Sequence, residues 1–305
     1  MRTRSQRLLN EVQRPEVYRE VLAIAGRHEI ALSVWEADPG APTVVFLPGT
    51  MTHPLFYEDF LDGLAQHGIH VVGVHYPNHG KSPRSPDPFR FEDLVTSAEV
   101  AVHWAQQTFA TPIVTLGSSQ GGMVAMALAI DEDRIAATIA HNVLDPAAPE
   151  TLRVTRFPQW LEPAYHATVR IAEVGARLAP RLPVPIGAYL DLARVCTETT
   201  REQFDADPLG LHAYPVEFLA SLMAADLRGM FDGRIGRPVT VVAATGDPLF
   251  PFDYIQAVFD RLVAPAKELV TLDRDCHLIF NDCVADTVPV VAEIVRRHTH
   301  TAVLT

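Results

Sequence analysis

The sequence predicts an α/β domain with a mostly parallel central sheet, helices on both faces, and a helical cap inserted late in the sheet. Short, continuously apolar runs such as residues 43–47 alternate with helix-like segments, as parallel strands buried on both faces do. This alternation stops after about residue 145 and resumes at 237. We therefore predict a core of residues 1–145 and 237–305 and a proline-rich cap of residues 146–236. A separate small domain is the alternative, but the later strands continue the earlier pattern.

The elements are predicted in chain order from hydrophobic periodicity and from glycine and proline positions. Before the nucleophile motif, we expect a polar arm or short helix at 1–17, a hairpin of 21–24 and 30–35 around Gly26, strands at 43–47 and 71–74, and helices at 56–64 and 94–104. After it, we expect strands at 135–140, 239–243 and 269–272, cap helices at 164–179 and 215–223, and a final helix at 288–295.

Composition excludes several classes of function. The chain has 25 Lys and Arg against 37 Asp and Glu, so its net charge is −12, which disfavours nucleic acids and anionic membranes as partners. No apolar run reaches the ~20 residues that span a bilayer, and no apolar segment follows the basic residues at the N-terminus. Three scattered cysteines fit a reducing compartment. We expect a cytoplasmic protein; its oligomeric state is not predicted.

The segment Gly117-Ser118-Ser119-Gln120-Gly121 fits the pattern G-x-S-x-G. An apolar run at 112–116 precedes it and reads as a strand, and residues 122–129 read as a buried helix. A strand, a tight turn and a helix form a nucleophile elbow, which exposes the serine hydroxyl in a strained backbone conformation. We predict that Ser119 is a nucleophile. The alternative is that Ser119 merely caps the helix.

A serine hydroxyl needs a base and a group that orients the base. Asp247 follows the strand at 239–243 and His277 follows the strand at 269–272, so both lie where catalytic groups collect in open α/β sheets. We predict that Asp247 and His277 complete a triad with Ser119. Asp145, after the strand at 135–140, is the alternative acid. Asp275 is too near His277 in sequence to come from a different strand end.

An acyl-transfer site also needs donors for the oxyanion. The backbone N–H of Gln120, directly after the serine, is one candidate. The other should come from the loop after residues 43–47, where Thr50 is our choice and Met51 the alternative.

We expect neither a cofactor nor a metal ion. His75 and His79 are close in sequence, but no Cys, Asp or Glu nearby completes a ligand set. A structural turn is the expected role of this segment.

Together these residues resemble the α/β-hydrolase superfamily over about residues 20–298. The family's His-Gly-x loop corresponds to Pro48-Gly49-Thr50, and its elbow to Gly117–Gly122. Its D-x-x-G-x-G-x-S stretch corresponds to residues 75–82, with His75 in place of Asp and Asn78 in place of Gly. Within the superfamily, Asp207-Pro208-Leu209 resembles the cap of the monoacylglycerol lipase and lysophospholipase branch.

The resemblance implies hydrolysis of a small apolar or acyl carboxylic ester through an acyl-enzyme intermediate. Lactonases, peptidases, C–C bond hydrolases, acyltransferases and cofactor-free haloperoxidases share the same triad, and a non-catalytic small-molecule receptor could use the same scaffold. Several apolar cap residues could line a substrate pocket or form the cap's own core: Phe157, Trp160, Leu161, Tyr165, Leu178, Tyr189 and Leu190.

Overall fold

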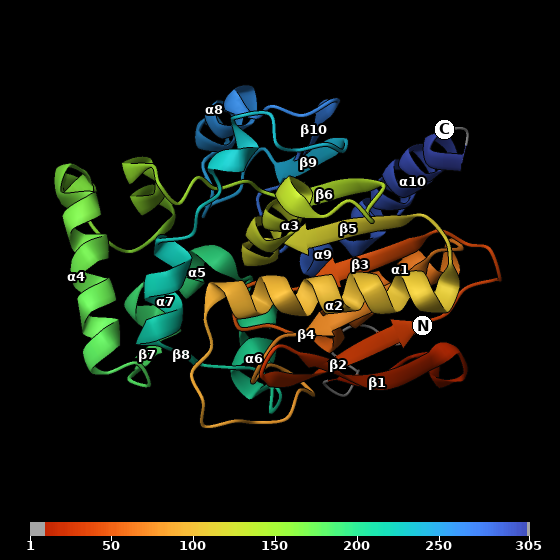
Figure 1. Ribbon diagram of the computed structural model, residues 1–305, viewed down its shortest axis with the longest axis horizontal. Coiled ribbons are helices and arrows are strands. Elements are labelled where there is room, and N and C mark those ends of the chain that lie inside the picture. Colours follow the sequence, from red (N-terminus) through yellow and green to blue (C-terminus); the bar gives the residue numbers. More distant parts are fainter. Residues whose placement is uncertain (1–9, 304–305) are drawn as a thin grey trace.

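Eight strands form one sheet at the centre of the computed structural model, which describes residues 10–303 (Figure 1). Their order across the sheet is β1-β2-β4-β3-β5-β6-β9-β10. The strands are β1 (Tyr18–Ala25), β2 (His28–Trp35), β3 (Thr43–Leu47), β4 (His70–His75), β5 (Ile113–Ser118), β6 (Ala137–His141), β9 (Val239–Ala244) and β10 (Lys267–Leu272).

The sheet is parallel from β4 to β10, and β2 joins it antiparallel to both β1 and β4. The β1–β2 hairpin turns at Gly26, whose φ of +59° is easily adopted only without a side chain. Strands β3, β4, β5, β6 and β9 are buried along their whole length. This burial explains why their sequences are continuously apolar instead of alternating.

Helices cover both faces of the sheet, and residue alternation along the strands separates the two cores. Val45 and Leu47 of β3 point to one core, while Val44 and Phe46 point to the other. The first core packs under α2 (Phe91–Phe109), α3 (Gln120–Asp131) and α8 (Phe252–Arg261). The second packs under α1 (Glu58–Gln66), α9 (Ile279–Asp282) and α10 (Val284–Val303).

The chain between β6 and β9 forms a helical cap beyond the carboxyl ends of the strands, at the left of Figure 1. Its main helices are α4 (Tyr165–Leu178), α5 (Leu192–Val195), α6 (Glu198–Ala206) and α7 (Val216–Met223). A two-stranded ribbon of β7 (Pro183–Pro185) and β8 (Ala213–Pro215) joins them, with short 3-10 turns between. One of these turns, η5 (Gln159–Ala164), precedes α4.

The predicted fold class is confirmed, and every predicted strand is present within a few residues of its predicted bounds. Helix α8, the short helices α5 and α6, and the β7–β8 ribbon were not predicted. Of the predicted N-terminal arm, residues 1–9 lie outside the described residues, and a 3-10 turn, η2 (Pro15–Val17), leads into β1. Within residues 10–303, no helix is long and apolar enough to cross a membrane.

Candidate active site

Ser119 stands at the turn between β5 and α3 with φ +52° and ψ −115°. This strained, left-handed conformation is the one predicted for a nucleophile elbow. Ser119 precedes the first residue of α3, but its side chain does not cap the helix. The elbow also requires its two glycines. A Cβ on Gly117 would lie 2.1 Å from the carbonyl oxygen of Gly121, and a Cβ on Gly121 would lie 2.0 Å from that of Leu47.

Three side chains from separate strand ends form a hydrogen-bonded chain at the elbow. His277 Nε2 lies 2.9 Å from Ser119 Oγ, and His277 Nδ1 lies 2.9 Å from Asp247 Oδ2. An ionised carboxylate can only accept hydrogen bonds, so His277 carries its proton on Nδ1 and leaves Nε2 free to accept the serine proton. The structure therefore brings together the three residues predicted as a triad.

Asp247 is held by three further donors. Its Oδ1 accepts the backbone N–H groups of Leu249 and Phe250 at 2.8 and 2.9 Å, and its Oδ2 accepts Asn142 Nδ2 at 2.9 Å. Burial alone would raise the pKa of Asp247, but its electrostatic interaction and hydrogen bond with His277 outweigh burial and lower the pKa to about 2. The carboxylate stays ionised at neutral pH and holds the imidazole in one tautomer.

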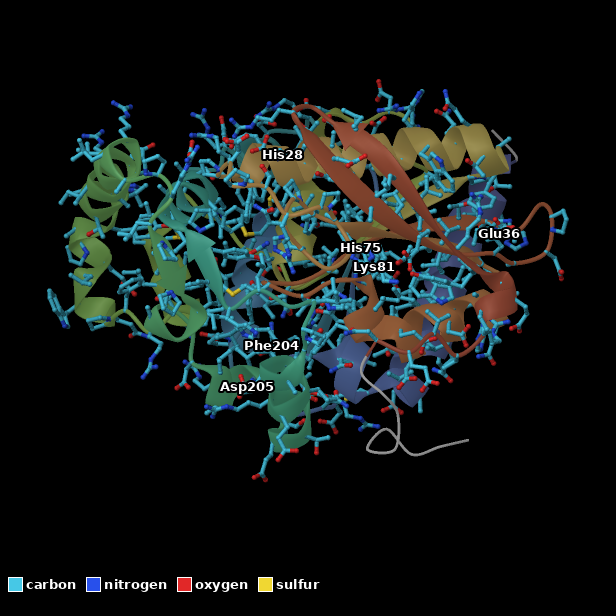
Figure 2. All side chains as sticks on the ribbon, turned by 90° about the horizontal axis from the view of Figure 1, so that it is seen from below. His28, Glu36, His75, Lys81, Phe204 and Asp205 are labelled. Carbon is cyan, nitrogen blue, oxygen red and sulfur yellow. The ribbon has the colours of Figure 1, made fainter. Side chains whose placement is uncertain are left out.

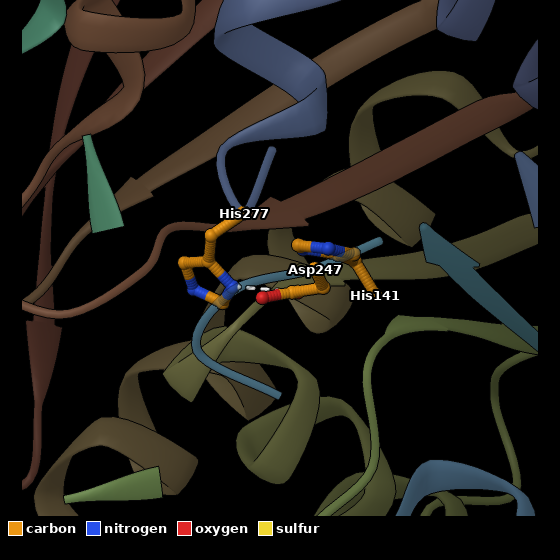
Figure 3. Close-up of side chains that lie close together, drawn as sticks. All are labelled: His141, Asp247 and His277. Carbon is orange, nitrogen blue, oxygen red and sulfur yellow. Dashed lines mark hydrogen bonds and ion pairs between the residues drawn. The ribbon is translucent and has the colours of Figure 1, made fainter. Parts of the chain in front are cut away.

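His141, at the end of β6, completes a cluster with Asp247 and His277 (Figure 3). Among the described residues, these three form the one group whose ligand atoms lie as close as a metal site requires. Two of them are already joined to each other and to Ser119. Burial lowers the pKa of His141 to about 3, so this neutral ring adds no charge beside the Asp247 carboxylate. His141 is not part of the hydrogen-bonded chain; its Nε2 lies 3.3 Å from Nδ2 of Asn142, which also bonds Asp247.

The structure places the alternative acids elsewhere. The Asp145 carboxylate pairs with Arg261 at 3.0 Å and accepts the N–H of Ala147. Asp275 is exposed on the loop before His277. Neither carboxylate is bonded to the His277 ring, whose Nδ1 faces Asp247.

The loop after β3 makes a β-turn beside the elbow. Thr52 N–H donates to Gly49 C=O, so Thr50 and Met51 are the central residues of the turn. Such a turn leaves the N–H of its second residue, Thr50, without a partner in the turn. The N–H of Gln120, the first residue of α3, likewise has no acceptor within its helix. The N–H of Met51 is engaged, since it donates to Tyr214 Oη at 2.7 Å. Thr50 Oγ1 lies 3.3 Å from Gln120 Oε1, so the two candidate donors are neighbours.

Two unequal cavities meet at Ser119 under the cap. The larger has a volume of about 330 Å³ and is lined from the core by Thr50, Gln120 and Met123. The smaller has a volume of about 30 Å³ and is lined by His277 and Cys196, among others. Walls of the larger cavity are overwhelmingly apolar, as expected for an acyl or other hydrocarbon group.

The predicted cap residues divide into two sets. Five of them line the two cavities: Phe157, Leu161, Tyr165, Tyr189 and Leu190. The expectation was wrong for the other two, because Trp160 is 75% exposed and Leu178 is 83% exposed. Trp160 lies in the 3-10 turn η5, where it points to solvent while its neighbour Leu161 points to the cavity.

The histidines of residues 75–82 hold a turn, as predicted. His75 Nδ1 accepts the N–H of Lys81, and its Nε2 lies 2.8 Å from Ser33 Oγ; Figure 2 shows His75 and Lys81 side by side. Asn78, which replaces the family's glycine, has φ +64°. Asn tolerates this left-handed conformation better than most residues, and its side chain bonds Ser85 across the loop.

Asp207, in the segment that resembled the lipase branch, ties the cap to the core. Its carboxylate lies 2.8 Å from Nε2 of His53, which follows the β-turn after β3, and both side chains are buried.

Sequence reasoning missed Asn142, His141 and Phe250. Phe250 stacks on the His277 ring at 5.4 Å with an interplanar angle of 5°. Asn142 and His141 follow the strand predicted at 135–140, so the strand-end rule could have found them. No such signal marks Phe250.

Two known proteins match this chain over part of its length. The chain is 32% identical over 134 residues to a putative non-heme haloperoxidase of Mycobacterium phage D29, covering 42% of this chain and 44% of the relative. It is 22% identical over 252 residues to phospholipase YtpA of Bacillus subtilis, covering 81% of this chain and 92% of that protein. The chain thus spans less than half of the first relative and most of the second.

Among solved structures, the monoacylglycerol lipase of Paleococcus ferrophilus is similar with a TM-score of 0.71 and 20% identity, covering 88% of this chain and 99% of the lipase chain. This likeness confirms the predicted α/β-hydrolase fold. The model of the family described as serine aminopeptidase, S33, matches residues 39–284. The chain therefore belongs to the serine aminopeptidase S33 family of α/β-hydrolases.

Proposed function

We propose that this protein is a serine hydrolase that cleaves carboxylic esters through an acyl-enzyme intermediate. The observation that carries the proposal is the hydrogen-bonded chain from Ser119 through His277 to Asp247, with both bonds at 2.9 Å. Ser119 Oγ attacks the ester carbonyl carbon while His277 Nε2 takes its proton. His277 then gives the proton to the leaving alcohol, and the acyl group stays on Ser119. Water, activated by the same imidazole, releases the acid.

The tetrahedral intermediate carries a negative oxygen that needs fixed donors. We assign the backbone N–H groups of Gln120 and Thr50 to this role. Thr50 is preferred to Met51 because the N–H of Met51 already donates to Tyr214 Oη. Gln120 contributes from the first turn of α3, where the helix dipole also favours negative charge.

The two cavities support an assignment of the two halves of the ester. His277 must protonate the leaving oxygen, so the alcohol belongs in the small cavity that His277 lines. The acyl group then occupies the large apolar cavity, which the elbow residues Gln120 and Met123 line. A volume of about 30 Å³ holds roughly two water-sized groups. The preferred substrates are therefore short-alcohol esters of apolar acids.

Isomeric esters test this proposal without changing total hydrophobicity. Ethyl octanoate and octyl acetate have the same composition, but their long chains lie on opposite sides of the reacting carbonyl. We expect a higher kcat/KM for ethyl octanoate. In a series of ethyl esters, each added acyl methylene should stabilise the transition state by up to ~0.8 kcal/mol until the cavity is full.

The control is the same pair of esters with the Ser119→Ala variant, which should hydrolyse neither above background. A preference for octyl acetate would reverse the assignment of the cavities while leaving ester hydrolysis intact. Hydrolysis of neither ester by the wild-type protein, across shorter and longer members of both series, would contradict the proposed function.

A further inference from the structure

Tyr214 is a buried residue of the cap ribbon whose hydroxyl reaches into the core. It belongs to β8, and its ring packs between Phe89, Phe218 and His79. Its Oη lies 2.7 Å from Met51 N, 2.9 Å from His79 Nε2 and 3.4 Å from Gln120 Nε2. One hydroxyl of the cap therefore contacts the oxyanion turn, the elbow residue and the loop after β4.

These contacts are consistent with a single arrangement of protons. His79 Nδ1 lies 2.9 Å from the carbonyl oxygen of Pro77, so Nδ1 carries the proton and donates it. Burial lowers the pKa of His79 to about 3, which leaves Nε2 unprotonated and able to accept from Tyr214. The Tyr214 hydroxyl thus donates to His79 and accepts from Met51 and, more weakly, from the Gln120 side chain. Its one donor and two acceptor sites are all used.

Met51 is held in place by the cap through both of its backbone polar groups. Its N–H donates to Tyr214, and its C=O accepts the N–H of Leu211 at 3.1 Å. Met51 has φ +59°, a conformation that a non-glycine residue keeps only when its surroundings impose it. Thr50, the adjacent residue in the same turn, is the proposed oxyanion donor, so the orientation of its N–H depends on this turn.

We propose that Tyr214 is a positioning residue through which the cap fixes the oxyanion turn. The inference rests on the serine-hydrolase function proposed above and adds a second role for the cap beyond shaping the cavities. Within residues 10–303, Tyr214 lines neither cavity at Ser119, so its hydroxyl acts on substrate indirectly, through Met51 and Thr50 and, more weakly, through the side chain of Gln120. Its removal should weaken transition-state binding and leave ground-state binding unchanged.

The test compares Tyr214→Phe with Tyr76→Phe. Both substitutions remove one hydroxyl from a fully buried ring beside His79, but within the described residues the Tyr76 hydroxyl has no hydrogen-bond partner. Direct loss of an oxyanion donor costs about 10²–10³-fold in kcat, so loss of the group that positions a donor should cost less, about tenfold.

For Tyr214→Phe we expect this tenfold loss in kcat, a KM within about twofold of wild type, and a similar tenfold loss in affinity for a trifluoromethyl ketone, whose adduct with Ser119 places an oxyanion in the hole. Tyr76→Phe should match wild type in all three. A Tyr214→Phe enzyme with wild-type kcat, or with a raised KM and unchanged kcat, would overturn the inference while the hydrolase function stands.

Amide hydrogen exchange gives a second measurement if Tyr214→Phe does not fold. In the wild-type protein the Met51 amide should exchange as slowly as the amides of β3, because it is buried and bonded to Tyr214. Exchange at the rate of an exposed loop would overturn the inference. A wild-type protein that neither reacts with the ketone nor hydrolyses any ester would overturn the proposed function and this inference with it.

Discussion

Hydrogen bonds fix both the position and the charge of the Asp247 carboxylate. Four donors converge on its two carboxylate oxygens, from His277, Asn142 and the backbone of Leu249 and Phe250. Such a carboxylate is fixed in position and in charge, and its fixed position holds the His277 ring at its distance from Ser119. The imidazole that we propose as the base is therefore oriented before a substrate arrives.

Replacing Asp247 by Asn should lower kcat by about 10⁴-fold. The Asn amide can donate to His277 Nδ1 and so stabilise the tautomer that carries its proton on Nε2, and in this tautomer Nε2 cannot accept the proton of Ser119. The matched variant is Asp145→Asn, which breaks only the pair with Arg261 and should stay within about threefold of wild type. Steady-state kinetics on one ester would decide. An Asp145→Asn variant more impaired than Asp247→Asn would show that the carboxylate beside His277 in the structure is not the catalytic one.

At the scale of elements, the site is built where strand ends meet the cap. Ser119, Asp247 and His277 follow β5, β9 and β10, while the proposed oxyanion turn follows β3. Parallel strands bring these loops to one edge of the sheet, so residues far apart in sequence become neighbours. The cap closes this edge and provides most of the wall of the larger cavity, where we propose that the acyl group binds.

The cap was also the element least predictable in detail. Its helices α4 and α7 followed the expected periodicity, but the 3-10 turn η5 has no 3.6-residue period from which to assign faces. Trp160 was therefore expected in a pocket or in the cap's own core and is instead on the surface, whereas the adjacent Leu161 lines the cavity.

At the scale of the whole molecule, the sequence was sufficient for the fold and for the three central side chains. Buried strands appear as contiguous apolar runs, and Asp247 and His277 are marked by following such runs. Contacts without a local signature could not be predicted. Asn142 bonds Asp247, which is 105 residues away in sequence, and Tyr214 bonds Met51, which is 163 residues away. In both cases tertiary packing alone brings the partners together.

Buried neutral histidines should make the whole molecule sensitive to acid. Burial lowers the pKa of His79 and His141 to about 3 and that of His75 well below its usual value. In the unfolded chain each titrates near ~6.5. Between these values the unfolded state binds more protons than the folded state, so stability falls as pH falls.

From pH 7.5 to 5.5, three such groups together should lower the free energy of unfolding by about 4 kcal/mol. Denaturant titrations at the two pH values measure this difference directly, independently of any effect of pH on activity. An unfolding free energy that is equal at both pH values would show that these rings are not buried as neutral groups.

The central claim, that Ser119 is a nucleophile activated by His277, is tested most directly with a fluorophosphonate probe and peptide mapping. We predict one adduct on the folded wild-type protein, located on Ser119, and no adduct on Ser119→Ala. Ser118→Ala is the matched control, since Ser118 adjoins the nucleophile but is buried in β5, and it should label like wild type. An adduct on Ser118, or a folded wild-type protein without any adduct, would contradict the account.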